Sequence, residues 1–319
     1  MDRMLRSFFN LTLISLLFLA SGVQAQEPRL SYMLNPGESY FLESDLQQNT
    51  HSESIDNQEI SFYNLTRMEF IINSVDSAGQ IHMSVRYRDL LISMLAPQLN
   101  IDISSASGKN KMLSEMVDML ELHSFQMVMT PAGKMVSLNG LDDIFVSLAS
   151  KPAADSSERE VILKTLEEAY GSDAFHSLIN LFVYVYPVIQ PMSNWTNDIT
   201  YYFNTKAVKM VNRFYLTKST REAVVIQGLG MLNAMKEFEE TTGMGEVKST
   251  VSGSQTYDFR MDSESGWLKR CISRQRVKIE TTIVKSSYLP AGLRIPSYTE
   301  TTFEVRGGRL EEISDIQEL

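Results

Sequence analysis

The methionine residues of this sequence have a type and a spacing that could bind a soft metal ion. Met127 and Met129 alternate on one face of a predicted strand, and Met116 and Met119 share one face of a predicted helix. Thioether sulfur is a soft ligand that selects Cu(I). However, the same faces continue with other apolar residues, and methionine is an ordinary filler of irregular cores. The pattern therefore favours core packing or the lining of an apolar ligand cavity, and we expect no metal and no cofactor.

Catalytic motifs are missing from the sequence. It contains no G-x-S-x-G, no H-E-x-x-H and no Walker loop. Its four histidines are widely separated, at His51, His82, His123 and His176. Cys271 is the single cysteine, so no intrachain disulfide can form, and a buried structural thiol is expected. We therefore expect a protein that is not an enzyme.

Residues 1–25 have the pattern of a secretory signal peptide. Arg3 and Arg6 precede an apolar run over residues 11–20, and Ala25 ends an A-x-A-like segment. The run is about half of the ~20 apolar residues that a spanning helix needs. No cysteine stands at the cleavage point for lipid attachment. We expect cleavage after Ala25 and a periplasmic or secreted mature chain without a transmembrane segment.

The charge balance argues against nucleic acid as a partner. The chain has 29 basic and 39 acidic side chains, a formal net charge of −10. Phosphate backbones and anionic lipid surfaces are bound through clustered lysine and arginine. The one basic run, LKRCISRQRVK at 268–278, alternates with apolar residues. This alternation predicts the solvated face of a strand.

Alternating apolar and polar residues predict antiparallel strands joined by tight turns. Residues 68–72 and 81–88 alternate on either side of VDSAGQ, in which Gly79 can adopt a positive φ. The turn TPAGK precedes Met135, and the turn DSESG precedes Trp267 in the same way. A further strand pair is expected around the NPGE turn.

The middle of the chain changes to a helical period. Apolar residues recur at intervals of three and four over residues 111–121, and further helices are expected at 141–148, 157–170 and from Ser172 onward. We therefore predict an α+β protein with a curved, half-barrel-like antiparallel sheet and a central helical insertion. The predicted single exported domain covers residues 26–319, with strands at about 29–105 and 124–138, helices at about 111–121 and 141–186, and strands at about 197–305.

The stretch from Leu178 to Ile189 is the most continuously apolar part of the predicted mature chain. An element that is apolar on all sides must be covered by protein, ligand or partner. We expect Phe182 to pack on the concave side of the sheet, and Tyr184 and Tyr186 to reach a rim. With the methionines, the candidate ligand-binding residues are Met127, Met129, Phe182, Tyr184 and Tyr186.

Several turn and strand motifs resemble an uncharacterised family of exported bacterial proteins. Its members carry a GESY strand turn, a T-P-x-G hairpin before a G-L-D helix start, and F-D-x-x-[ST]-G hairpins. The corresponding stretches here are LSYMLNPGESY, MTPAGKMVSLNGLD and YDFRMDSESGWL. A fourth stretch, PVIQPMSNW, also resembles the family. The resemblance implies an antiparallel sheet curved around helices, similar to bacterial lipoprotein-carrier half-barrels. It implies no activity.

Three functional hypotheses follow from these patterns. The leading one is a non-catalytic envelope protein that binds an apolar or amphipathic ligand, or an envelope partner, on the concave face of the sheet. The second is a structural or assembly protein of the envelope with a filled core. The third is an unrecognised hydrolase. An open apolar cleft favours the first hypothesis over the second.

Overall fold

The computed structural model describes residues 29–52, 59–96, 99–104, 111–150, 156–189, 193–203, 206–233, 237–242 and 245–313. In this part of the chain, 61% of residues lie in strands and 18% in helices. The predicted signal peptide lies outside these residues, so cleavage after Ala25 stays a prediction.

Long strands alternate with a small group of helices. The helices are α2 (Lys111–Leu122), α3 (Leu141–Ser150), α4 (Ser156–Tyr170) and α5 (Ser172–Phe182), with a short 3-10 helix η1 (Leu310–Ile313). The strands are β1 (Ser39–Ser52), β2 (Glu59–Val75), β3 (Ile81–Ala96), β4 (Leu99–Ser104), β5 (Ser124–Met129), β6 (Met135–Asn139), β7 (Asn194–Phe203), β8 (Lys206–Ser219), β9 (Ala223–Asn233), β10 (Phe238–Thr242), β11 (Gly245–Asp262), β12 (Leu268–Lys285) and β13 (Arg294–Arg309).

All of these strands belong to one antiparallel sheet that does not close. Its order is β6-β5-β3-β2-β1-β13-β12-β11-β9-β8-β7, with β4 added to β3 and β10 added to β11. The predicted α+β class is therefore wrong, because the protein is mainly β. The β5–β6 hairpin separates α2 from α3. The strands dominate because they are long: β11 and β12 each run for 18 residues.

Local patterns placed three of the hairpin turns correctly. Gly79, Gly133 and Gly266 lie in the turns after β2, β5 and β11, and their φ angles are 78°, 86° and 70°. A side chain is strained at such angles, whereas glycine adopts them readily. The basic run of β12 alternates as predicted: Arg274 and Arg276 are exposed between buried neighbours. Cys271 is fully buried, and burial raises the pKa of its thiol.

The predicted strand pair around the NPGE turn does not form. Residues 29–38 carry no strand, although Leu30, Tyr32 and Leu34 alternate inward. This segment crosses turns of the sheet: the Tyr32 amide donates to the Pro131 carbonyl at 2.8 Å. The alternation therefore predicts the burial of these side chains correctly, but the backbones of Tyr32 and Met33 are hydrogen-bonded to turns and not to a strand.

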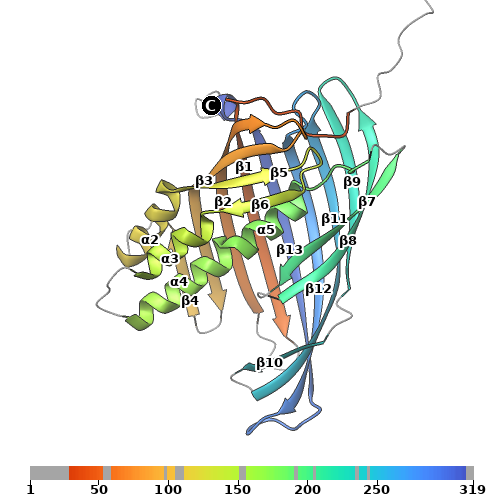
Figure 1. Ribbon diagram of the computed structural model, residues 1–319. Coiled ribbons are helices and arrows are strands. Elements are labelled where there is room, and N and C mark those ends of the chain that lie inside the picture. The colour runs from red at the N-terminus through yellow and green to blue at the C-terminus, as the bar shows by residue number, and fades with distance from the viewer. Residues whose placement is uncertain are drawn as a thin grey trace, which may run out of the picture.

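Helix α5 lies against both edge strands of the sheet. It contacts β6 at one edge and β7 at the other. On the β7 side, the Asn180 amide donates to the Thr200 carbonyl at 3.0 Å, and the Ser177 hydroxyl accepts from the Tyr202 amide at 3.0 Å. These bonds satisfy backbone groups that an edge strand leaves unpaired. The sheet therefore curves around α5, and the helices gather on one side of it (Figure 1).

Helix α5 begins without a side-chain cap. Gly171 is the N-cap residue and supplies no side-chain hydrogen bond. The hydroxyl of Ser172 donates instead to the Asp142 carboxylate at the start of α3. This bond connects α5 to α3 and does not cap α5.

Trp267 is the centre of the aromatic core between β1, β2 and the segment before β1. Its ring centroid lies 5.0 Å from Tyr40, 5.2 Å from Phe70 and 5.8 Å from Tyr32. The indole N–H donates to the Phe41 carbonyl at 2.9 Å, so its polar atom is satisfied. This cluster joins β1 and β2 to the segment before β1.

Candidate functional site

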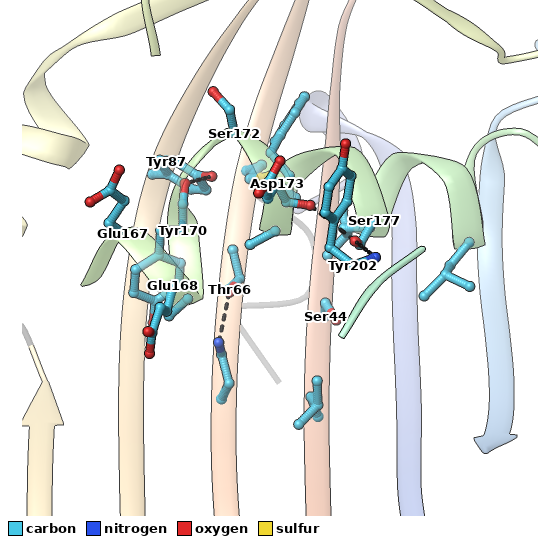
Figure 2. A pocket seen from close by; sticks show the side chains of 18 of the residues that line it. Ser44, Thr66, Tyr87, Glu167, Glu168, Tyr170, Ser172, Asp173, Ser177 and Tyr202 are labelled. Carbon is cyan, nitrogen blue, oxygen red and sulfur yellow. Dashed lines mark hydrogen bonds between the residues drawn. The ribbon is translucent and has the colours of Figure 1, made fainter. Parts of the chain in front are cut away.

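A cavity of about 800 Å³ lies between the α4–α5 helix pair and the inner face of the sheet (Figure 2). Its walls come from elements far apart in the sequence, because β1, β2, β3, β7 and β13 all contribute. The lining residues are Ser44, Leu46, Phe62, Asn64, Thr66, Met68, Tyr87, Asp142, Lys164, Glu167, Glu168, Ala169, Tyr170, Ser172, Asp173, Ala174, Phe175, Ser177, Leu178, Leu181, Phe182, Tyr201, Tyr202 and Phe303.

One wall is the apolar face of α5. Phe175, Leu178, Leu181 and Phe182 recur at three- to four-residue spacing and line the cavity together. Phe182 is fully buried, and its ring contacts Phe303 of β13 at a centroid distance of 5.2 Å. The helix therefore presents an apolar surface that the sheet covers only in part.

The opposite wall carries polar side chains at positions that face inward on the strands. Ser44 of β1 stands directly opposite Thr66 of β2, and both are buried. The Thr66 hydroxyl donates to the Asn64 side-chain oxygen at 2.8 Å. Figure 2 shows Ser44 and Thr66 on strands that pass beneath the helix. Because these groups are small and neutral, they can fix the orientation of a ligand without a large desolvation cost.

Tyr170 adds a polar group that lacks a partner. Its side chain is buried, lines the cavity, and carries a hydroxyl oxygen that has no hydrogen-bond partner. Burial raises the pKa of Tyr170, and the adjacent Tyr87 and the nearby Thr66 and Glu121 contribute smaller effects. The hydroxyl is therefore neutral, and it is buried beside Thr66.

A row of inward-facing polar residues crosses the sheet next to the apolar lining. Gln48, Thr301, Gln275 and Gln255 stand opposite one another on β1, β13, β12 and β11. The Gln275 amide donates to Gln255 at 2.9 Å, and the Tyr201 hydroxyl, a lining residue of the cavity, lies 3.5 Å from the Gln275 oxygen. Burial raises the pKa of Tyr201 to about 12. The cavity is thus bordered by neutral amides and hydroxyls at this end.

Acidic residues surround the cavity where α4 meets α5. Glu167 and Glu168 come from the end of α4, Asp173 from the start of α5, and Asp142 from the start of α3. Lys164 is the one basic lining residue, 3.9 Å from Glu168. Within the described residues, no group of three histidine, cysteine, aspartate or glutamate side chains could hold a metal ion.

The structure brings one of the five sequence-predicted site residues to this cavity, namely Phe182. Met127 and Met129 lie on β5 opposite Met83 and Ile81 of β3, and both are buried in the core away from the lining. Met127 and Met129 therefore pack as core side chains.

Tyr184 and Tyr186 do not reach a rim, because both are buried. The Tyr186 hydroxyl donates to the Gly266 carbonyl at 2.8 Å, and Asn197 donates to the Tyr184 carbonyl at 3.0 Å. The chain leaves the helix at Phe182, earlier than predicted, and then passes beneath β7. Burial raises the pKa of both tyrosines.

The sequence contained a signal for the residues that were missed. Along β1 the inward positions read Tyr40, Leu42, Ser44, Leu46 and Gln48, so polar residues interrupt an apolar face. A polar residue in the inward phase of a strand must find a buried partner or face a cavity. The inward position of Ser44 can therefore be recognised from the strand pattern. Tyr170 carries no local signal, because tyrosine at a helix end is common.

Comparison with protein families identifies relatives of the chain. A model of a family of unknown function (DUF6263) matches residues 78–268. The chain belongs to this family. The match includes three of the four motif stretches found in the sequence and the helical wall of the cavity, whereas Ser44, Thr66 and Phe303 lie outside it. A search of curated proteins finds no match.

Among solved structures, this family member is similar in fold to a part of lipovitellin. The structure titled "Lipid-protein interactions in lipovitellin" superposes with a TM-score of 0.52 at 9% identity. It covers 86% of this chain but only 25% of that chain, so the chain spans about a quarter of that protein. OmpF of Salmonella typhi in complex with daunomycin gives a TM-score of 0.22 at 6% identity, covering 87% of this chain and 100% of OmpF. An outer membrane channel of Pseudomonas putida F1 gives 0.20 at 8% identity, covering 88% and 99%.

Among the described residues, no helix combines the length and the apolar character that crossing a membrane requires.

Proposed function

We propose that this protein is a non-catalytic, exported binding protein that holds an amphipathic ligand in the cavity between α5 and the sheet. The observation that carries the proposal is the cavity itself: about 800 Å³, with an apolar helix wall and a few buried hydroxyls. Ligand pockets have this size and this mixture of apolar lining and sparse polar groups.

The arrangement of the walls supports binding over a purely structural role. A structural protein with a filled core would close the space between α5 and β1–β2, because interiors pack to the density of organic crystals. Here Leu178 and Leu46 line open space instead, and each is only partly buried.

Two further observations agree with an apolar ligand and an exported location. The fold of lipovitellin, whose title concerns lipid–protein interactions in that protein, provides an analogy at the level of fold. Residues 1–25 carry the signal-peptide pattern, which directs the mature chain to the periplasm or the medium.

Binding is tested with a neutral fluorescent naphthylamine probe and a variant that fills the cavity. The full chain is expressed with its own leader, recovered from the envelope fraction without detergent, and stripped of bound lipid. Ala174→Phe places a ring in the cavity, because Ala174 of α5 lines it. We expect this variant to lose most of the probe binding. Ala149→Phe, on the exposed side of α3, is the matched control and should bind as the unmodified protein does.

Native mass spectrometry of the protein before lipid removal then identifies what the cavity holds. Retained lipid or another amphiphile supports the proposal. Equal probe binding by Ala174→Phe and the unmodified protein would place binding elsewhere and overturn it.

Export is tested separately by N-terminal sequencing of the protein from the envelope fraction. The expected first residue is Gln26. A chain that still begins at Met1 would contradict export by cleavage.

A further inference from the structure

We infer that the cavity selects amphiphiles with an uncharged, hydroxyl-bearing head group, such as a long-chain alcohol or a monoacylglycerol. This inference rests on the proposed function and names its ligand class. It starts from the distribution of charge over the cavity walls. Every buried lining residue is uncharged. The charged lining residues are all exposed, namely Asp142, Lys164, Glu167, Glu168 and Asp173.

An ionised head group has no suitable place in the buried part of this cavity. It would lose its water there without meeting an opposite charge, which costs far more than burying a neutral group that forms hydrogen bonds. Among the exposed charged residues it would form only weak ion pairs, because water screens them. A neutral head group can enter together with its hydrocarbon chain.

Ser44 of β1 offers a hydroxyl to such a head group. Its side chain is only 4% exposed, lines the cavity, and forms no hydrogen bond with any described residue. Unlike the enclosed hydroxyl of Tyr170, the Ser44 hydroxyl keeps contact with the open space of the cavity. Buried hydroxyls are normally hydrogen-bonded. The partner of the Ser44 hydroxyl therefore comes from the contents of the cavity.

Asn64 of β2 adds a second neutral group close to Ser44. Thr66 stands directly opposite Ser44, and Asn64 lies two residues away on the same face of β2. The Thr66 hydroxyl donates to the Asn64 side-chain oxygen at 2.8 Å, and no other described residue bonds to the Asn64 side chain.

The Asn64 N–H groups therefore remain for an acceptor in the cavity, whereas the Ser44 hydroxyl can donate or accept. Diagonal neighbours of this kind have Cα atoms about 7–8 Å apart. A head group with two oxygen atoms, such as glycerol, can reach both side chains. Thr66 acts as a positioning residue because its hydrogen bond orients the Asn64 amide.

Apolar side chains surround this neutral pair and provide a place for the hydrocarbon chain. Leu46 of β1 stands directly opposite Asn64. Phe62 of β2 and Leu178 and Phe182 of α5 also line the cavity. The head group thus bonds to the sheet wall while the chain lies between the sheet and α5.

Displacement of the neutral probe by three decyl compounds tests the selection. Decanol is uncharged, while decanoate is an anion and decylamine a cation at neutral pH, and their chains are equal in length. We expect decanol to bind at least about tenfold more tightly than either ion, because only its head group can be buried without an unpaired charge.

The variant Ser44→Ala tests the named contact. It should bind decanol roughly two- to tenfold more weakly, which corresponds to one neutral hydrogen bond. Its binding of 1-chlorodecane should stay unchanged, since that head group cannot donate and scarcely accepts. Ser252→Ala, at an exposed serine of β11 outside the cavity lining, is the matched control and should bind both compounds as the unmodified protein does.

Two results would overturn the inference and leave the proposed function in place. One is an ion that binds the unmodified protein as tightly as decanol does. The other is unchanged decanol binding by Ser44→Ala. If none of the decyl compounds displaces the probe, the proposed function itself fails.

Discussion

The ring of Phe182 on α5 lies 5.2 Å from the ring of Phe303 on β13, centroid to centroid, with 56° between the ring planes. This contact joins α5 to β13, a strand in the middle of the sheet. Because α5 also contacts the edge strands β6 and β7, the sheet is curved around a helix that it does not fully enclose. The uncovered part of the helix surface is the wall of the cavity.

Replacing Phe182 with alanine should destabilise the protein by about 3–5 kcal/mol, because the side chain is fully buried and its removal leaves a void. Chemical denaturation measures the change. Val146→Ala, at a position 67% exposed on α3, is the control and should change stability by less than about 0.5 kcal/mol. An unmoved transition for Phe182→Ala would mean that α5 does not pack where the structure places it.

The turn between β5 and β6 should tolerate no side chain at Gly133. Its φ is +86°, and an added Cβ would lie 2.1 Å from the Val183 carbonyl oxygen. Gly37 has a φ of +88°, and nothing lies within 4 Å of its added Cβ. The Gly37→Ala variant therefore measures the cost of the backbone strain without a clash. We expect Gly133→Ala to cost about 1–3 kcal/mol more than Gly37→Ala, since only the first adds a clash. Equal losses in the two variants would refute the close approach of Val183.

Glu121 on α2 should make stability depend on pH. One of its carboxylate oxygens is buried without a hydrogen-bond partner, and burial, with Asp89 and Asp118 nearby, raises its pKa from 4.5 to about 7. The folded state thus binds the proton more tightly than the unfolded state does. The stability that this provides is present below about pH 4.5 and is lost as pH rises toward 7.

Glu121→Gln should therefore raise the melting temperature at pH 8 and leave it nearly unchanged at pH 4. Glu160→Gln, at an exposed site on the next helix but one, serves as the control and should change neither value. A Glu121→Gln variant that is less stable than the unmodified protein at pH 8 would show that the charged carboxylate is stabilised rather than strained.

Tyr170→Phe should separate stability from binding. A buried hydroxyl without a partner costs about 1–3 kcal/mol, so its removal is expected to leave stability equal or higher. The same change should leave binding of the neutral probe unchanged, because the hydroxyl is buried and does not reach the open space of the cavity. A clear loss of stability would instead indicate a hydrogen bond between Tyr170 and Thr66 in solution.

The sequence by itself determined the features that depend on near neighbours. Alternation fixed which side chains of β11 and β12 face inward, since successive residues of a strand point to opposite faces. Gly79, Gly133 and Gly266 marked turns because a positive φ is a property of one residue. The helices at 111–122 and 156–170 were also predictable, because their apolar residues repeat within a few turns.

Only the tertiary structure decided where those elements meet. The pairing of β1 with β13 joins residues more than two hundred positions apart, and no local pattern encodes such a pairing. Tyr184 and Tyr186 are buried because β7 returns over them, not because of their own sequence. The cavity has the same origin. Its walls come from opposite ends of the chain, and its open volume exists because a curved sheet and a straight helix cannot contact each other along their whole length.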